Sequence, residues 1–155
     1  MPNWCHNRVT ISALGEDTTQ FQELIKKFQS ETPFQAIKPQ PDWPNTPNSA
    51  GQLPVKREER HANGEIFYTT YDFPDGKNDD RWYDWANNEW GTKWDASDFS
   101  TDDLDEECGY VEFSFHTAWG PATGIYEEIV ENYEDVNVSW FYDEPGMECA
   151  GYLPN

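Results

Sequence analysis

An excess of negative charge constrains this chain more than any other feature of its sequence. Thirty Asp and Glu residues oppose ten Lys and Arg residues over 155 positions, which gives a formal net charge of −20 at pH 7. Self-repulsion of this size works against any compact state, so the fold must bury enough apolar surface to offset it. The charge also excludes unaided binding to nucleic acid or to an anionic membrane, because both carry the same sign. It favours a basic partner.

Aromatic residues supply most of the material for a core. Leu, Ile, Val and Phe make up only about 17% of the chain, which together with a high net charge is typical of disorder. Eight Trp, eight Tyr and nine Phe indicate the opposite, because disordered chains are poor in aromatic residues. A length of 155 residues corresponds to one domain. We therefore expect a single folded domain over residues 1–155.

The acidic residues are concentrated in the second part of the chain. Residues 1–60 carry seven acidic and seven basic residues, whereas residues 61–155 carry 23 acidic and three basic residues. Such asymmetry predicts one acidic face. Three Cys residues without a CxxC pair and the lack of a long apolar run predict a soluble protein of the cytoplasm with no membrane contact.

Hydrophobic periodicity predicts an α+β fold. Alternating apolar residues predict strands, and apolar residues at i, i+3, i+4 and i+7 predict helices. The predicted strands cover residues 8–13, 66–73, 110–117 and 136–142, and the predicted helices cover residues 18–30, 79–90 and 121–133. Five prolines make residues 39–54 a loop, and an acidic segment occupies residues 95–107. This order predicts helices packed on one face of a mostly antiparallel sheet.

Several short motifs are similar to those of one known family. They are the opening Met1-Pro2-Asn3-Trp4-Cys5-His6-Asn7, the runs Trp82-Tyr83-Asp84-Trp85, Trp90-Gly91-Thr92-Lys93-Trp94-Asp95 and Phe115-His116-Thr117-Ala118-Trp119-Gly120-Pro121, and the closing Tyr142-Asp143-Glu144-Pro145-Gly146 with Ala150-Gly151. With these motifs the chain resembles the YubB-type proteins with a ferredoxin-like domain, which occur on plasmids, phages and genomic islands. The resemblance implies a ferredoxin-like sheet with an inserted loop and a Trp-rich helix. It implies no catalytic residues.

Two dense groups of carboxylates are the candidate partner-binding residues. The first group is Asp95, Asp98, Asp102, Asp103, Asp105, Glu106 and Glu107, and the second is Glu127, Glu128, Glu131 and Glu134. On a helix Glu127, Glu131 and Glu134 share one face, where like charges reduce helix stability. A row of carboxylates can imitate a phosphate backbone toward a protein that grips DNA through Lys and Arg. The alternative interpretation is an acidic surface that serves only solubility.

Other residue types predict no chemistry. Cys5, His6, Cys108 and His116 are zinc-ligand types without paired spacing within either segment. They could converge if the first strand pairs with residues 110–117, but Cys5 and His6 on a strand would then point to opposite faces. We therefore expect neither a metal nor another cofactor. The tryptophans of residues 82–94 lie among acidic residues, which favours core packing over base stacking.

Three hypotheses of function follow. The first is a non-enzymatic acidic protein of a mobile element that binds a basic nucleic-acid-binding protein of the host, as a DNA mimic that inhibits a defence nuclease complex such as a CRISPR–Cas effector (an anti-CRISPR). The second is a scaffold or regulatory protein that binds its partner through an aromatic or Pro-rich surface. The third is an acid-dependent metal hydrolase. The first agrees best with the charge and its uneven placement.

Overall fold

The computed structural model describes residues 2–154, which form two compact units. Unit 1 contains the described residues up to Pro39 and from Ala86 onward, and unit 2 is Gln40–Trp85. The sequence predicts one domain in which residues 39–54 are only a loop. In the structure, residues 40–54 of that loop and the following residues up to Trp85 form the second compact unit.

A five-stranded antiparallel sheet is the centre of unit 1. Its strand order is β4-β5-β1-β6-β7. The bounds are β1 (Trp4–Ala13), β4 (Ser97–Asp105), β5 (Tyr110–Ala118), β6 (Val136–Glu144) and β7 (Cys149–Tyr152). The predicted α+β class is therefore confirmed. The sheet is larger than the sequence predicts, because β4 and β7 extend it at its two edges, and a ferredoxin-like fold is not established by it.

Alternation of apolar and polar residues gives the sheet one buried face. In β1, Val9 and Ile11 are fully buried, and in β5 the buried side chains are Val111, Phe113 and Phe115. The residues between them point the other way, because successive side chains of a strand alternate. Residues of β1 such as His6 and Arg8 therefore lie on the uncovered face, which we call the open face of the sheet.

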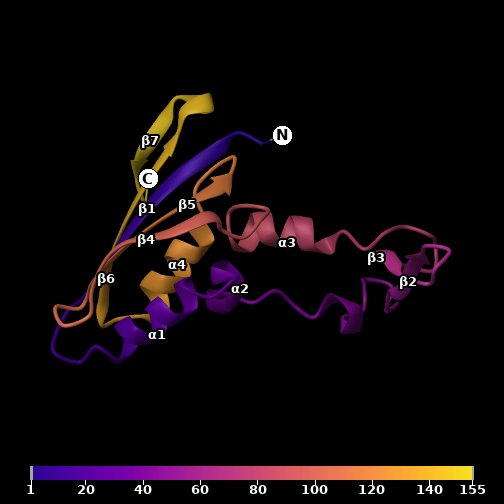
Figure 1. Ribbon diagram of the computed structural model, residues 1–155, viewed down its shortest axis with the longest axis horizontal. Helices are drawn as coiled ribbons and strands as arrows, with labels where there is room; N and C mark the ends of the chain where they lie inside the picture. Colours follow the sequence, from indigo (N-terminus) through magenta and orange to yellow (C-terminus); the bar gives the residue numbers. More distant parts are fainter. Residues whose placement is uncertain (1, 155) are drawn as a thin grey trace. The chain divides into compact units, whose positions relative to one another are not determined.

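Helices α1 (Thr19–Phe28), α2 (Pro33–Ile37) and α4 (Thr123–Asn132) lie along the other face of the sheet (Figure 1). In α1 the buried residues are Phe21, Leu24, Ile25 and Phe28, the spacing that the sequence predicts. Helix α3 (Arg81–Glu89) spans the boundary between the units, and only its Ala86 is buried. None of the helices within residues 2–154 combines the length and apolar character that a bilayer-spanning helix needs.

The aromatic core is built mainly from phenylalanines rather than from the tryptophans of residues 82–94. The ring of Phe28 stacks on Phe113 at a centroid distance of 5.0 Å, and Phe99 lies 5.2 Å from Phe113. Trp90 is buried, but Trp82 keeps 37% of its surface exposed and Trp94 keeps 41%. The expectation that this tryptophan cluster packs in the core is thus wrong for Trp82 and Trp94.

The chain leaves unit 1 before unit 2 and returns to it afterwards, and these two points of unit 1 are in contact. Lys38 lies just before unit 2, and its Nζ forms an ion pair with Glu89 Oε2 at 2.8 Å. The indole Nε1–H of Trp90 donates to the backbone carbonyl of Lys38 at 2.8 Å. Both contacts lie within unit 1, so unit 1 itself brings the two ends of the insertion together.

Unit 2 contains a short helix, η1 (Trp43–Asn45), and a hairpin of β2 (Val55–Arg60) and β3 (Ile66–Asp72). The sequence predicts the second strand but not the first. A two-stranded hairpin alone is at best marginally stable in water. Pro54 and Thr70 are the buried residues of this unit, so most of the hairpin's side chains are exposed.

The polar core of the sheet gives a stability prediction. Trp140 is fully buried, and its Nε1–H donates to Asn7 Oδ1 at 2.9 Å. Trp140→Ala leaves a cavity and an unpaired buried amide oxygen, so it should lower the free energy of unfolding by about 3–5 kcal/mol. Urea denaturation followed by circular dichroism measures this change. Trp119→Ala is the matched control, because Trp119 is 52% exposed, and it should cost about 1 kcal/mol or less.

Candidate functional site

Strand β4 carries the first group of carboxylates along an edge of the sheet. It pairs only with β5, where Asp103 stands opposite Glu112 and Asp105 opposite Tyr110. These β5 residues alternate with the buried Val111 and Phe113, so Asp103 and Asp105 point to the open face. Two register shifts interrupt the pairing, between Ser97 and Ser100 and between Thr101 and Asp103. Such bulges increase the local twist of an edge strand.

The carboxylates of β4 and of the turn that follows are exposed and have few partners. Asp102 accepts a hydrogen bond from Ser100 Oγ at 2.9 Å, and Asp105 accepts one from the backbone N–H of Cys108 at 3.1 Å. The Cys108 N–H lowers the pKa of Asp105, because it stabilises the ionised form. Within residues 2–154, no Lys or Arg lies within ion-pair distance of any of them. Among the described residues, Asp98 contacts the ring of His116, its Oδ2 lying 3.1 Å from Nδ1.

Glu127, Glu128 and Glu131 of the second group lie on helix α4, in the layer on the other side of the sheet, whereas Glu134 lies in the turn after the helix ends at Asn132 and does not share its face. Ile125 and Ile129 of α4 are fully buried toward the core, and Glu127, Glu131 and Glu134 are exposed. Glu128 is half-buried. The α4 carboxylates and the open-face carboxylates of β4 therefore belong to two separate surfaces. The sequence predicts one acidic face, and the structure provides two.

Asp95 has a structural role that separates it from the exposed carboxylates. Its Oδ1 accepts a hydrogen bond from the backbone N–H of Phe34 at 2.9 Å, and its Oδ2 accepts one from Gln35 N–H at 3.0 Å. These are free N–H groups of the first turn of α2, and Ala96 N–H donates to Oδ1 as well, at 2.7 Å. Burial raises the pKa of Asp95, and the three donors oppose that change. Asp95 is thus a cap for α2 in the interior of unit 1.

The four zinc-ligand types do not gather into one site. Cys5 lies on the buried face of β1, and burial raises the pKa of its thiol to about 11, so the thiolate needed for metal binding or nucleophilic attack is not formed at neutral pH. Cys108 and Cys149 are exposed. Within residues 2–154, no three His, Cys, Asp or Glu side chains are placed to hold a metal ion together. His6 and His116 do meet on the open face.

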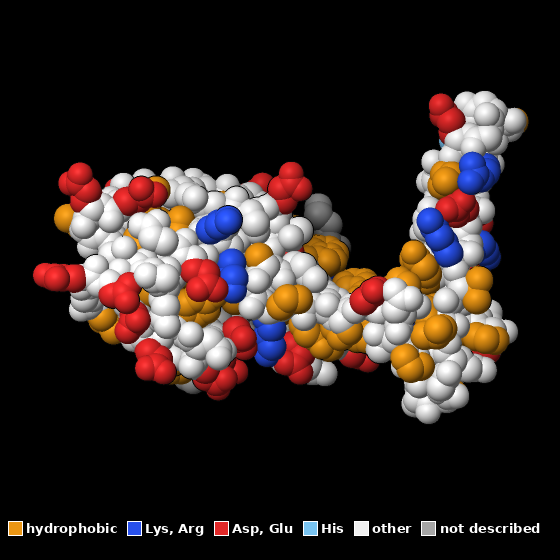
Figure 2. Space-filling model, turned by 90° about the horizontal axis from the view of Figure 1, so that it is seen from below, with side chains coloured by type: hydrophobic (Ala, Val, Ile, Leu, Met, Phe, Trp, Pro, Cys, Tyr) orange, Lys and Arg blue, Asp and Glu red, His pale blue; other side chains and the backbone are white. Residues whose placement is uncertain are grey.

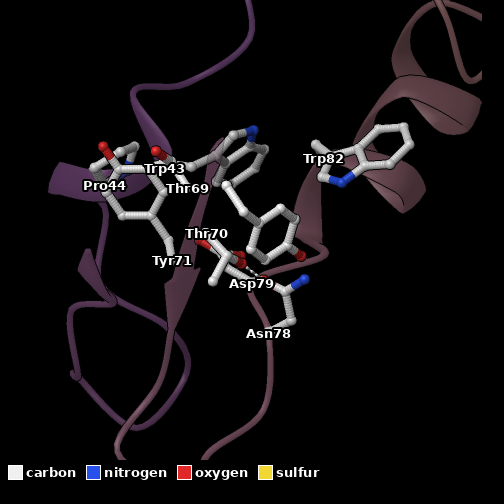
Figure 3. Close-up of a pocket in the computed structure, with 9 residues that line it drawn as sticks. Trp43, Pro44, Thr69, Thr70, Tyr71, Asn78, Asp79 and Trp82 are labelled. Atoms are coloured by element: carbon white, nitrogen blue, oxygen red, sulfur yellow. Dashed lines mark hydrogen bonds between the residues drawn. The ribbon is translucent and has the colours of Figure 1, made fainter. Parts of the chain in front are cut away.

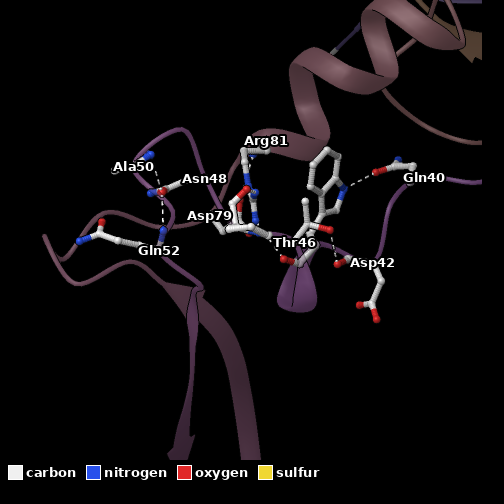
Figure 4. Close-up of polar contacts among 10 residues, drawn as sticks. Gln40, Asp42, Thr46, Asn48, Ala50, Gln52, Asp79 and Arg81 are labelled. Carbon is white, nitrogen blue, oxygen red and sulfur yellow. Dashed lines mark hydrogen bonds and ion pairs between the residues drawn. The ribbon is translucent and has the colours of Figure 1, made fainter.

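Arg81 organises unit 2, and the sequence analysis missed it. Its Nε donates to Asp79 Oδ1 at 2.9 Å, and its Nη2 donates to Asp79 Oδ2 at 2.9 Å and to the backbone carbonyl of Trp43 at 2.9 Å (Figure 4). The guanidinium carbon lies 4.9 Å from the Trp43 ring centroid and 5.1 Å from that of Phe73. Arg81 lowers the pKa of Asp79 through these hydrogen bonds. No local sequence pattern indicates such a network.

An aromatic pocket of about 360 Å³ lies beside this network in unit 2 (Figure 3). Trp43, Tyr68 and Trp82 provide aromatic walls, and Thr70 and Asn78 are joined by a hydrogen bond of 2.6 Å at its base. Tyr68 comes from the hairpin, whose turn contains Asn63-Gly64, a strong hairpin signal in sequence. That dipeptide, followed by the aromatic residues of β3, could have indicated the hairpin.

The cap at Asp95 gives a prediction that separates structural from exposed carboxylates. Asp95→Ala leaves three part-buried N–H groups without their acceptor and should lower the free energy of unfolding by about 1–2 kcal/mol. Asp103→Ala should be neutral or slightly stabilising, because Asp103 stands opposite Glu112 and like charges repel across a strand pair. Thermal or urea denaturation at pH 7 measures both. Equal effects of the two substitutions would contradict the distinction.

Comparisons with protein-family models, with curated proteins and with solved structures found no match to this chain. The resemblance to YubB-type proteins stays a prediction from the sequence motifs.

Proposed function

We propose that this protein is a non-enzymatic binding protein that occupies a phosphate-binding groove of a basic, nucleic-acid-binding protein. The observation that supports this best is the exposed row of carboxylates on β4 and its turn, which has no Lys or Arg partner within residues 2–154. The row comprises Asp98, Asp102, Asp103, Asp105, Glu106 and Glu107. We call it the β4 acidic row.

The charge density of the β4 acidic row is about half that of a single DNA strand. At a rise of about 3.4 Å per residue, Asp98 to Asp105 extends about 24 Å and carries four carboxylates, or about one charge per 6 Å. A single DNA strand carries about one charge per 3.4 Å of helix axis. A groove whose Lys and Arg side chains bind phosphates can therefore contact, on β4, about half as many negative charges as on a DNA strand of the same length.

Protection of the sheet edge is a weaker explanation of the same residues. Proteins place charged side chains on edge strands to prevent pairing with other chains. The bulges of β4 already disturb its free edge, and one or two charges would be sufficient. Six carboxylates on the strand and its turn exceed that need and add repulsion, such as that between Asp103 and Glu112.

The charge of the protein is concentrated in the unit that holds the β4 acidic row. The residues of unit 1 include 21 acidic and five basic side chains, and those of unit 2 include nine and five. Figure 2 displays Asp and Glu side chains over unit 1, whereas Lys and Arg gather on the hairpin of unit 2. A basic partner is therefore attracted to unit 1, and the attraction is screened over about 8 Å at physiological salt.

The partner class and the origin of the protein are part of the proposal. Strands β1, β4, β5 and β6 with helices α1 and α4 follow the chain order β-α-β-β-α-β, which supports a ferredoxin-like core extended by β7. With the motif resemblance, this supports a mobile-element protein acting in the host cytosol on a defence nuclease complex such as a CRISPR–Cas effector.

Charge reversal tests this proposal. The immobilised protein is used to capture host proteins, and the captured protein is then challenged with a 20-bp DNA duplex and with increasing salt. The duplex should displace it, and binding should fall steeply with salt, because ion release dominates such contacts. Asp102→Lys with Asp103→Lys should weaken binding at least about tenfold, since two phosphate-like contacts are replaced by repulsion.

Two matched double variants locate the surface. Glu127→Lys with Glu131→Lys changes the same charge on α4, and Glu16→Lys with Glu31→Lys changes it far from both acidic groups in the sequence. If the β4 acidic row is the site, both controls retain most of the affinity. Uniform weakening by all three pairs, or binding that the duplex does not affect, would contradict the proposal.

The aromatic pocket of unit 2 favours a second function, that of a scaffold or regulatory protein. Tyr68 and Trp82 are 47% and 37% exposed and lie together at this pocket, so they offer aromatic surface to a partner. Asp79 at the pocket is already paired with Arg81, so the pocket offers aromatic surface rather than free charge. Its best occupant is an apolar or aromatic side chain of an extended peptide from a partner protein.

Substitution in the pocket separates the second function from the first. Tyr68→Ala with Trp82→Ala should abolish capture of such a partner and leave salt-sensitive binding to the β4 acidic row unchanged, because aromatic contacts at interface centres contribute most of the affinity. Val55→Ala, an exposed residue of β2 outside the pocket, is the control and should retain capture. Pull-down at low and high salt measures both properties. Loss of binding in the control would point to hairpin disruption instead.

A further inference from the structure

Two histidines face each other on the open face of the sheet. His6 of β1 and His116 of β5 are direct partners in the strand pairing. Nδ1 of His6 lies 2.8 Å from Nε2 of His116, and the two rings are nearly perpendicular, at 87°, with centroids 4.4 Å apart. The two nitrogens are thus hydrogen-bonded to each other across the strand pair. His6 is exposed, and the His116 side chain is 31% exposed, so this contact is open to solvent.

A carboxylate orients the second histidine from behind. Asp98 Oδ2 accepts a hydrogen bond from Nδ1–H of His116 at 3.1 Å. Asp98 lies in the bulge between Ser97 and Ser100 and has a φ of 52°, a left-handed conformation that Asp tolerates. With the proton held on Nδ1, the Nε2 of His116 has a lone pair that faces His6 and accepts the hydrogen bond from His6 Nδ1–H. A carboxylate hydrogen-bonded to the far nitrogen of a histidine is the usual support of a metal-ligating imidazole.

We propose that His6 Nδ1 and His116 Nε2 together bind a divalent transition metal ion of the zinc, nickel and copper class. Imidazole nitrogens suit these ions, and each ligates at about 2.0–2.1 Å. In tetrahedral geometry two such nitrogens are about 3.3–3.4 Å apart. To bind the ion, the rings must separate by about 0.5 Å from their present hydrogen bond, and the proton of His6 must move from Nδ1 to Nε2 through solvent. Both are small changes for two side chains that reach into solvent.

The surroundings restrict the site to two protein ligands. Cys5, the neighbour of His6, points to the buried face, and no third His, Cys, Asp or Glu completes a site among residues 2–154. Asp143 of β6 is the strand partner of His6 and lies on the same open face, where its charge attracts cations. Water fills the remaining positions around the ion. The proposed site shares one residue with the β4 acidic row, Asp98, which here orients His116 and does not bind the ion itself.

The inference revises the expectation of no metal site. The sequence predicts that Cys5 and His6 point to opposite faces of their strand. The structure confirms this, with Cys5 buried and His6 exposed. The spacing of His6 and His116, 110 residues apart, carries no ligand motif. The register of β1 against β5 brings them together, and register is fixed by the buried residues of both strands.

Calorimetric titration of the full-length protein with Ni²⁺ and with Zn²⁺, in an excess of Mg²⁺, tests the site. Mg²⁺ prefers oxygen ligands and therefore occupies the exposed carboxylates without competing for imidazole. We expect one equivalent of Ni²⁺ or Zn²⁺ to bind. His6→Asn and His116→Asn should each weaken it at least about tenfold, and Asp98→Asn should weaken it about 10–100-fold through the lost support of His116.

His61→Asn is the matched control, because His61 belongs to the hairpin of unit 2 and should leave the affinity unchanged. A second readout is the fluorescence of Trp4, whose ring centroid lies 6.4 Å from that of His116. Bound Ni²⁺ should quench it, and Trp4→Phe should remove the quenching but keep the binding. Circular dichroism melting confirms that each variant folds. Equal affinity in the wild type, His6→Asn and His116→Asn, or several weak equivalents insensitive to both, would overturn the proposal.

Discussion

The pairing of β1 with β5 on one side and β6 on the other is the constraint from which the rest of unit 1 follows. Val9 stands opposite Phe113 of β5 and Trp140 of β6, so three buried side chains meet in one row beneath the helices. Because side chains alternate, the same register sends His6, Arg8 and their partners to the open face. A slip of one residue would exchange the two faces, and burial of the aromatic row prevents it.

The open face is therefore not a random selection of polar residues. Arg8 forms an ion pair with Glu112 at 3.4 Å and lies over the ring of Phe141 at 5.4 Å. Arg8 is the basic residue of β1 in the middle of this face, and it is neutralised by its neighbour. Strand β4 lies on the other side of β5 from Arg8, and its carboxylates have no Lys or Arg partner among the described residues. The charges in the centre of the open face are paired, whereas the negative charges at its β4 edge are not. The charge is therefore unevenly distributed across the sheet, which the net charge alone does not describe.

The sequence predicted those elements whose residues alternate or repeat with a clear apolar side. Strands β1, β5 and β6 and helices α1 and α4 belong to this class, and all were expected close to their observed positions. For β4 the sequence predicts only an acidic segment, because Phe99 and Leu104 are its only large apolar residues. Its partner β5 and the contact of Phe99 with the core make it a strand, and neither is visible locally. The sequence identifies which positions are acidic, but the tertiary structure decides that they lie in two separate layers. It also decides that Asp95 is half-buried and caps a helix instead of facing solvent.

The contacts of Lys38 with Glu89 and Trp90 have a consequence for how this chain could have acquired its present length. Contacts within unit 1 hold both ends of the inserted segment together. The entropic cost of closing residues 39–88 into a loop is therefore offset by these contacts, and this cost grows only slowly with the number of residues in the loop. Segments of different length or sequence between these two points therefore alter the stability of unit 1 little. At this attachment point, evolution can replace one inserted segment by another while the sheet of unit 1, its carboxylates and its histidines stay unchanged.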